Sequence, residues 1–209
     1  RQYAKFVKIP CLDPADSQEA KDFTIAAFDI SEQFDTPVVL RLTTRVCHTS
    51  SPVEVVEQQV KLPEPGKFPR NPMKYAMLPG NARQRLPVIE ARLAQLSEFA
   101  ESFNLNHVEW KSKKLGIITG GIAYQYAKEV FPDASVLKLG MVYPLPQKMI
   151  KEFASQVEKV IVLEELTPFI EDQIRAMGVD LYHDELSNSH LYPLTKSLFP
   201  GLGELNSSI

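Results

Sequence analysis

Four polar residues that could take part in chemistry lie within six positions of one another: Thr43, Thr44, Arg45 and His48. An arginine guanidinium has the planar fork that fits a carboxylate, and a histidine can transfer a proton near neutral pH. The cluster could therefore bind an anionic substrate and exchange a proton with it. A loop brace or a subunit contact would use the same residue types, so both interpretations stay open.

The turn Thr119-Gly120-Gly121 could present backbone amides to an anion. It lacks the spacing of a dinucleotide fingerprint, and no Lys-Ser/Thr pair follows it as in a phosphate loop. We therefore favour a tight turn that packs a helix on a strand.

Glu164 and Glu165 follow an apolar stretch and could act as an acid and base pair. Successive residues at a strand end point to opposite sides, however, which disfavours a true pair. A charge at a helix N-terminus or an interface contact is the preferred interpretation.

Cysteine usage disfavours a metal centre. The sequence holds Cys11 and Cys47, with no further cysteine or paired histidine at ligand spacing. Two free, inert thiols are expected, and we assign no metal ligand and no cofactor-binding residue.

Composition is that of an ordinary globular protein, with 44% hydrophobic and 23% charged residues. The net charge of −3 argues against nucleic acid as the main partner. No apolar run approaches the roughly 20 residues needed to cross a bilayer, and no secretion signal begins the sequence. We therefore expect a cytoplasmic protein without a membrane partner.

Residues 1–60 predict one helix and one strand. Asp16 precedes Glu19 by three positions as in a capping box, and apolar residues at helical spacing then predict a helix over 17–34. Residues 37–42 predict a strand. Because one helix and one strand cannot enclose a core, this segment is expected to be the C-terminal part of a larger domain.

Residues 61–114 are basic, with 10 basic and 5 acidic side chains, between two acidic segments. Five prolines between Pro63 and Pro79 predict an extended connection over 62–72. Apolar residues from Leu86 to Phe103 then predict a connecting helix with Pro87 near its start.

Residues 115–209 alternate between short apolar strands and helices. Strands are predicted over 115–119, 135–139 and 159–163, and helices over 122–130, 148–157 and 168–177. This order predicts an α/β fold with a parallel sheet covered on both faces.

Four stretches together resemble one enzyme family in order and sequence. They are 16–22, 37–48, 138–146 (KLGMVYPLP) and 162–171 (VLEELTPFIE). Across most of residues 14–180 the chain resembles the α subunit of indolepyruvate ferredoxin oxidoreductases, which are thiamine-diphosphate-dependent 2-oxoacid oxidoreductases.

The resemblance implies an internal fragment of an enzyme that decarboxylates arylpyruvates, reduces ferredoxin and forms an acyl-CoA. It assigns 1–60 to the end of a pyrimidine-binding domain, 61–114 to a linker and 115–209 to a domain like the C-terminal domain of transketolase. The parent enzyme would hold thiamine diphosphate, Mg²⁺ and [4Fe-4S] clusters. Its partners would be the rest of the α subunit, a β subunit, ferredoxin and CoA, and a homo-oligomer is also open.

The family's activating glutamate and Gly-Asp-Gly motif would lie outside the chain, which is therefore expected to be inactive alone. The resemblance also places Thr43, Thr44, Arg45 and His48 in a family motif that faces the cofactor, where they would line the substrate channel or a domain interface. Two alternatives remain: a non-catalytic subunit-interaction module, and a related enzyme for pyruvate or branched 2-oxoacids.

Overall fold

A computed structural model describes residues 1–55, 66 and 69–182 of the chain. The predicted extended connection over 62–72 lies mostly outside the described residues. Its described end differs from the prediction, because a short helix, α4 (Pro72–Tyr75), begins at Pro72 with the Asn71 side chain as its cap.

The larger sheet has four strands in the order β3-β5-β4-β7. They are β3 (His107–Glu109), β4 (Ser112–Gly120), β5 (Ala134–Leu139) and β7 (Val160–Leu163). The strands β5, β4 and β7 are parallel, as predicted, whereas β3 pairs with β5 in the antiparallel sense and was not predicted. At three residues with a single apolar side chain, β3 carries too little pattern to be recognised.

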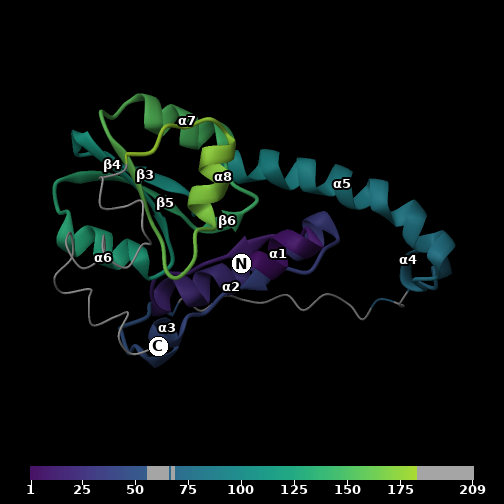
Figure 1. Ribbon diagram of the computed structural model, residues 1–209. Coiled ribbons are helices and arrows are strands. Elements are labelled where there is room, and N and C mark those ends of the chain that lie inside the picture. Colours follow the sequence, from purple (N-terminus) through teal and green to yellow (C-terminus); the bar gives the residue numbers. More distant parts are fainter. Residues whose placement is uncertain (56–65, 67–68, 183–209) are drawn as a thin grey trace.

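Helices cover both faces of this sheet (Figure 1). One face packs on α6 (Ala123–Val130) through Ala127, Ile117 and Val136. The other packs on α7 (Gln147–Ser155) and α8 (Ile170–Ala176), whose buried residues include Phe153 and Ile170. The predicted α/β fold and its three helices are confirmed, with boundaries that differ by one to two residues.

A smaller sheet of order β2-β1-β6 joins the N-terminal part of the chain to residues 141–143. Its strands are β1 (Cys11–Leu12), β2 (Val39–Leu40) and β6 (Met141–Tyr143). β1 is parallel to β2 and antiparallel to β6. The helices of this part are α1 (Gln2–Val7), α2 (Ser17–Phe34) and α3 (Thr44–His48).

The predicted helix over 17–34 is confirmed residue for residue. Asp16 caps it by accepting a hydrogen bond from the Glu19 amide at 2.9 Å, and the Glu19 carboxylate accepts from the Ala15 amide at 2.8 Å. Two backbone donors at the helix start are thereby satisfied. The predicted strand over 37–42 is shorter in the structure, since only Val39 and Leu40 pair.

The connecting helix α5 (Pro79–Ser102) begins earlier than predicted, so Pro87 lies inside it. The early start was missed because residues 80–85 are mostly polar and carry no apolar periodicity. The helix extends far beyond the sheets, with α4 at its distant end (Figure 1).

One apolar cluster links α2, α5 and the smaller sheet. It contains Leu12, Phe23, Ile30, Leu96, Ala100, Phe103 and Met141, all buried. Residues 1–55 therefore complete their core with α5 and β6. The division into 1–60, 61–114 and 115–209 stays a prediction.

Candidate functional site

Polar residues and turns follow directly on the ends of two pairs of parallel strands, β1 with β2 in the smaller sheet and β4 with β7 in the larger one. Asp13 follows β1, Arg41 follows β2, Gly121 follows β4 and Glu164 follows β7. A topological switch also lies between the ends of β4 and β7, because the helices that follow these neighbouring strands, α6 and α8, lie on opposite faces of the sheet. Ligands of open α/β sheets bind at such a point.

Asp13 connects the smaller sheet to the larger one. Its amide donates to the Gly140 carbonyl at 2.9 Å, and its carbonyl accepts from the Gly121 amide at 3.1 Å. Its side chain is held by Arg41, whose Nη1 donates to the two carboxylate oxygens at 3.0 and 2.7 Å. Asp13 is 1% exposed. Its backbone hydrogen bonds to Gly140 and Gly121 and its ion pair with Arg41 together fix its conformation.

Arg41 divides its guanidinium between the two parts of the chain. Its Nη1 faces Asp13, and its Nη2 donates to Glu165 Oε2 at 3.1 Å. Burial raises the pKa of the Asp13 carboxyl, although Arg41 opposes that shift. Burial also acts against the charge on Arg41, yet Asp13 and Glu165 together raise the pKa of its guanidinium. At the switch point the chain's own ionic side chains thus face one another.

The side chains of Glu164 and Glu165 contact different partners, as predicted for successive residues that point to opposite sides of a strand end. Glu164 Oε1 accepts from the amides of Phe169, Ile170 and Glu171 at 2.8, 3.0 and 3.1 Å, at the start of α8. Its Oε2 accepts from Arg1 at 2.8 Å. Glu165 instead reaches Arg41. The interpretation of a helix N-terminal charge is confirmed for Glu164, whereas the contact of Glu165 with Arg41 lies within the chain, so the interface contact stays a prediction.

The turn Thr119-Gly120-Gly121 packs against Asp13. Gly121 has a φ of 59°, and a Cβ on it would lie 2.7 Å from Asp13 Oδ1. Its amide is already bonded to the Asp13 carbonyl. The geometry agrees with a packing turn and leaves that amide unavailable to an anion.

The residues Thr43, Thr44, Arg45 and His48 form a short helix, α3, where a loop was expected. Thr43 is the N-cap of this helix. Its backbone is extended, and its Oγ1 accepts a hydrogen bond from the Val46 amide at 3.4 Å, an arrangement that favours the start of a helix. Thr44, Arg45 and His48 are exposed. Within the described part of the chain, the side chains of Arg45 and His48 show no hydrogen-bonding partner, whereas the Arg45 carbonyl accepts from the Thr49 amide at 3.0 Å.

A second buried ion pair, missed by the sequence analysis, fastens α2 to β5. Lys138 Nζ donates to both Glu19 oxygens at 2.6 Å and lies 4.6 Å from the centre of the Phe23 ring. Lys138 is fully buried, whereas the Glu19 side chain is 22% exposed. Burial lowers the pKa of Lys138, and Glu19 acts in the opposite direction.

The two cysteines are free, as expected. Cys11 is buried in β1, and burial raises the pKa of its thiol to about 11. A thiol with that pKa is almost wholly protonated at neutral pH and therefore a poor nucleophile. Cys47 lies on α3 and is exposed.

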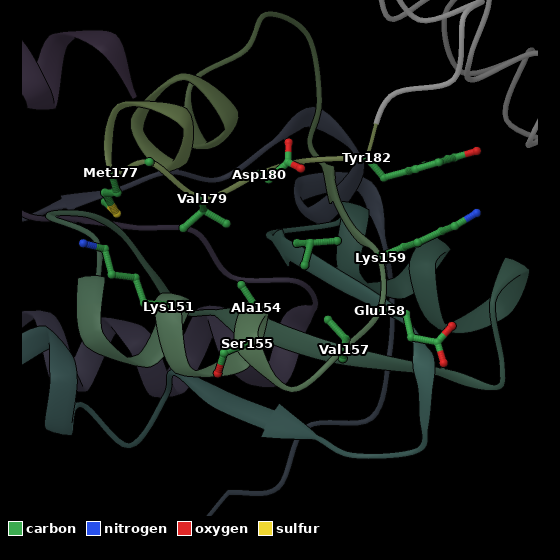
Figure 2. A pocket seen from close by; sticks show the side chains of 12 residues that line it. Lys151, Ala154, Ser155, Val157, Glu158, Lys159, Met177, Val179, Asp180 and Tyr182 are labelled. Atoms are coloured by element: carbon green, nitrogen blue, oxygen red, sulfur yellow. The ribbon is translucent and has the colours of Figure 1, made fainter.

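A hollow of about 570 Å³ lies at the opposite edge of the larger sheet, beside the first residue of β7. Figure 2 shows the Lys159 and Tyr182 side chains side by side at one end of it, with the Lys159 ammonium 4.2 Å from the ring centre. Its lining mixes Lys151 and Lys159 with Glu158 and Asp180, so no single charge of ligand is favoured.

Among residues 1–55, 66 and 69–182, no three or more His, Cys, Asp or Glu side chains are grouped to hold a metal ion. No helix in these ranges combines the length and apolarity required to cross a membrane.

Comparison with known proteins gives matches along almost the whole chain. Residues 4–109 match the family model described as pyruvate flavodoxin/ferredoxin oxidoreductase, thiamine diphosphate-binding. Residues 111–207 match the indolepyruvate oxidoreductase domain.

Curated relatives are indolepyruvate oxidoreductase subunits IorA. The protein from Archaeoglobus fulgidus is 38% identical over 183 residues, and that from Thermococcus kodakarensis is 35% identical over 190 residues. Each alignment covers 86% of this chain and 29% of the relative, so the chain spans less than a third of these proteins.

Among solved structures, a 2-oxoglutarate:ferredoxin oxidoreductase from Magnetococcus marinus matches with a TM-score of 0.56 at 16% identity. The match covers 83% of this chain and 40% of the other, and at that identity it supports the fold alone. The two family models account for the family: the chain belongs to the pyruvate flavodoxin/ferredoxin oxidoreductase family, within which it is similar to the indolepyruvate oxidoreductase subunit IorA.

Proposed function

We propose that this chain is part of an enzyme that oxidatively decarboxylates arylpyruvates, above all indolepyruvate, to acyl-CoA with ferredoxin as electron acceptor. The proposal is supported by the similarity to IorA over 86% of the chain. In this proposal the chain works with the remainder of an α subunit, a β subunit, ferredoxin and CoA in the cytoplasm.

Within that enzyme, we assign the substrate carboxylate to α3. The observation that carries the assignment is the exposed face of Thr44, Arg45 and His48 on a helix that starts three residues after Arg41. The Arg41 side chain itself reaches Asp13, after β1, and Glu165, after β7. A guanidinium without a described ionic partner fits a carboxylate. An imidazole one turn away could hold or move a proton.

The parent enzyme is proposed to use thiamine diphosphate, Mg²⁺ and [4Fe-4S] clusters. The described residues do not fit these groups, because they offer no cluster of metal ligands and because Asp13 and Arg41 face Gly121 and Glu165 at the switch point. No reaction step through the cofactor is therefore assigned to this chain, and its binding groups are proposed to lie elsewhere in the parent.

Replacement of Arg45 by alanine in the full parent complex tests the role of α3. We expect kcat/KM for indolepyruvate to fall about 10- to 100-fold, mainly through a higher KM, because a charged hydrogen bond to the substrate is lost. Steady-state kinetics with indolepyruvate and ferredoxin measures this. Arg83→Ala, which removes an exposed arginine from the distant part of α5, is the matched control and should leave kcat/KM unchanged. An unaltered kcat/KM in Arg45→Ala would remove α3 from the substrate site.

The 209-residue chain alone should not bind the cofactor. Calorimetric titration with thiamine diphosphate and Mg²⁺ is expected to give no measurable heat of binding, since the groups that hold the diphosphate are proposed to lie outside the chain. A dissociation constant in the micromolar range would contradict the proposal and place a complete cofactor site on these residues.

A further inference from the structure

Arg41 ties the chain segment that leads into α3 to both sheets. Its amide donates to the Leu12 carbonyl at 2.8 Å, which fixes the backbone at the end of β2. Its guanidinium then joins Asp13, after β1, to Glu165, after β7. The cap of α3, Thr43, follows two residues later, so the position of Arg41 sets where α3 begins.

The helix α3 has few attachments of its own. Thr43 and Val46 are its buried positions, at 9% and 5% exposed, and the cap hydrogen bond is long at 3.4 Å. The other residues of the helix are exposed. A five-residue helix is not stable by itself, so its placement comes from its surroundings, which are the segment that precedes it and helix α2, which it contacts.

The two partners of Arg41 differ in how much else holds them. The Asp13 side chain is buried, with the residue 1% exposed, and its backbone is hydrogen-bonded to Gly140 and Gly121, which follow β5 and β4. The Glu165 side chain is 27% exposed and comes from a different part of the chain, in a turn where Arg1 donates to the Glu165 carbonyl at 2.5 Å. The next residue, Leu166, has a φ of 65°, a conformation that a leucine adopts only where its surroundings impose it.

We propose that Glu165 is a positioning residue that, through Arg41, fixes the segment leading into α3 at the carboxyl ends of β1 and β7. It does not touch the substrate. It restricts the Arg41 guanidinium and so sets where Thr44, Arg45 and His48 stand. This inference rests on the proposed function, because the position of α3 affects the reaction only if α3 binds the substrate.

The test compares Glu165→Ala with Glu165→Gln in the full parent complex. The alanine variant should lower kcat/KM for indolepyruvate about tenfold, through the same rise in KM as Arg45→Ala, because a small displacement of a binding group is costly. The glutamine variant keeps a carbonyl oxygen that can accept from Arg41 Nη2 and should retain most of the activity. Glu152→Ala, an exposed acid on α7, is the matched control.

A second readout reports on α3 directly. Hydrogen exchange followed by mass spectrometry should show faster deuterium uptake in the peptide over 42–50 of Glu165→Ala, since the amides of Cys47 and Thr49 depend on the fold of α3. Uptake in the peptide over 20–30 should not change, which separates a local effect from general unfolding.

The outcomes distinguish the two claims. Unchanged uptake over 42–50 in Glu165→Ala would overturn the positioning role whatever the kinetics. Faster uptake with unaltered kcat/KM, while Arg45→Ala lowers it, would also overturn that role and leave α3 as the substrate site. If Arg45→Ala has no effect, the proposed function of α3 fails, and the inference fails with it.

Discussion

Glu19→Gln is expected to lower the free energy of unfolding of the 209-residue chain by about 3 kcal/mol, the lower part of the range for breaking a buried ion pair. The lower part applies because the Glu19 side chain is 22% exposed, so its carboxylate is already partly solvated in the folded chain. The loss arises because the Lys138 ammonium, fully buried between Phe23 and Glu19, would keep its charge without a counterion. Urea denaturation followed by circular dichroism measures the change.

Two further variants separate the charge from the packing. Glu32→Gln removes an exposed carboxylate from the same helix and should change stability by less than about 0.5 kcal/mol. Combining Glu19→Gln with Lys138→Met removes the buried cation and fills its space with an unbranched apolar side chain, so most of the lost stability should return. If the double variant is no more stable than Glu19→Gln, the buried charge is not the cause.

The pH dependence of the same pair has a definite sign. Burial lowers the pKa of Lys138 from its ordinary value of 10.5, so between the lowered pKa and 10.5 the unfolded chain binds more protons than the folded chain. Stability therefore rises with pH in that window. The original chain should gain relative to Lys138→Met as the pH approaches 10.5, and the gain should begin at lower pH when Glu19→Gln is also present.

The sequence was sufficient where a pattern was long or where a cap stood at its start. The helix over 17–34 has eighteen residues, an Asp16 cap and an apolar face, and its boundaries agree with α2. The strands β4, β5 and β7 were recognised because they are apolar runs between helices. The two-residue strand β1 has no pattern of its own, and its backbone is paired with β2 on one side and β6 on the other.

The candidate site could be predicted only where its residues lie close together in the sequence. Arg45 and His48 belong to a visible polar cluster, and Glu164 and Glu165 follow a clear strand. Asp13 and Lys138 were missed because their roles come from residues far away in the chain: Arg41 reaches Asp13 across 28 positions, and Lys138 reaches Glu19 across 119. A single lysine within the apolar run of β5 was the one local signal that a buried counterion exists.

Contacts among the residues of the site also connect the two sheets. Arg41, Asp13 and Gly121 form a continuous set of contacts from the end of β2 through the end of β1 to the turn after β4. A change at Gly121 therefore should affect both the fold and the placement of α3, although Gly121 touches neither substrate nor α3.

Gly121→Ala is expected to lower the free energy of unfolding by about 3 kcal/mol or more, from two contributions. Residues with a side chain pay about 1–2 kcal/mol in the left-handed region, and Gly121 has a φ of 59°. The new Cβ would also lie 2.7 Å from Asp13 Oδ1, so the carboxylate must move away from Arg41 and weaken a buried ion pair. Urea denaturation of the 209-residue chain measures the total.

The chain offers a matched control in Gly178, which has a φ of 78° but no atom within 4 Å of an added Cβ. Gly178→Ala should cost only the backbone contribution, about 1–2 kcal/mol, and the difference between the two variants reports the contact with Asp13. In an Asp13→Ala background the clash disappears, so adding Gly121→Ala should then cost no more than Gly178→Ala. Equal losses for the two glycines in the original chain would mean that Asp13 yields without cost, and that the ion pair with Arg41 does not hold the ends of β1 and β2 together.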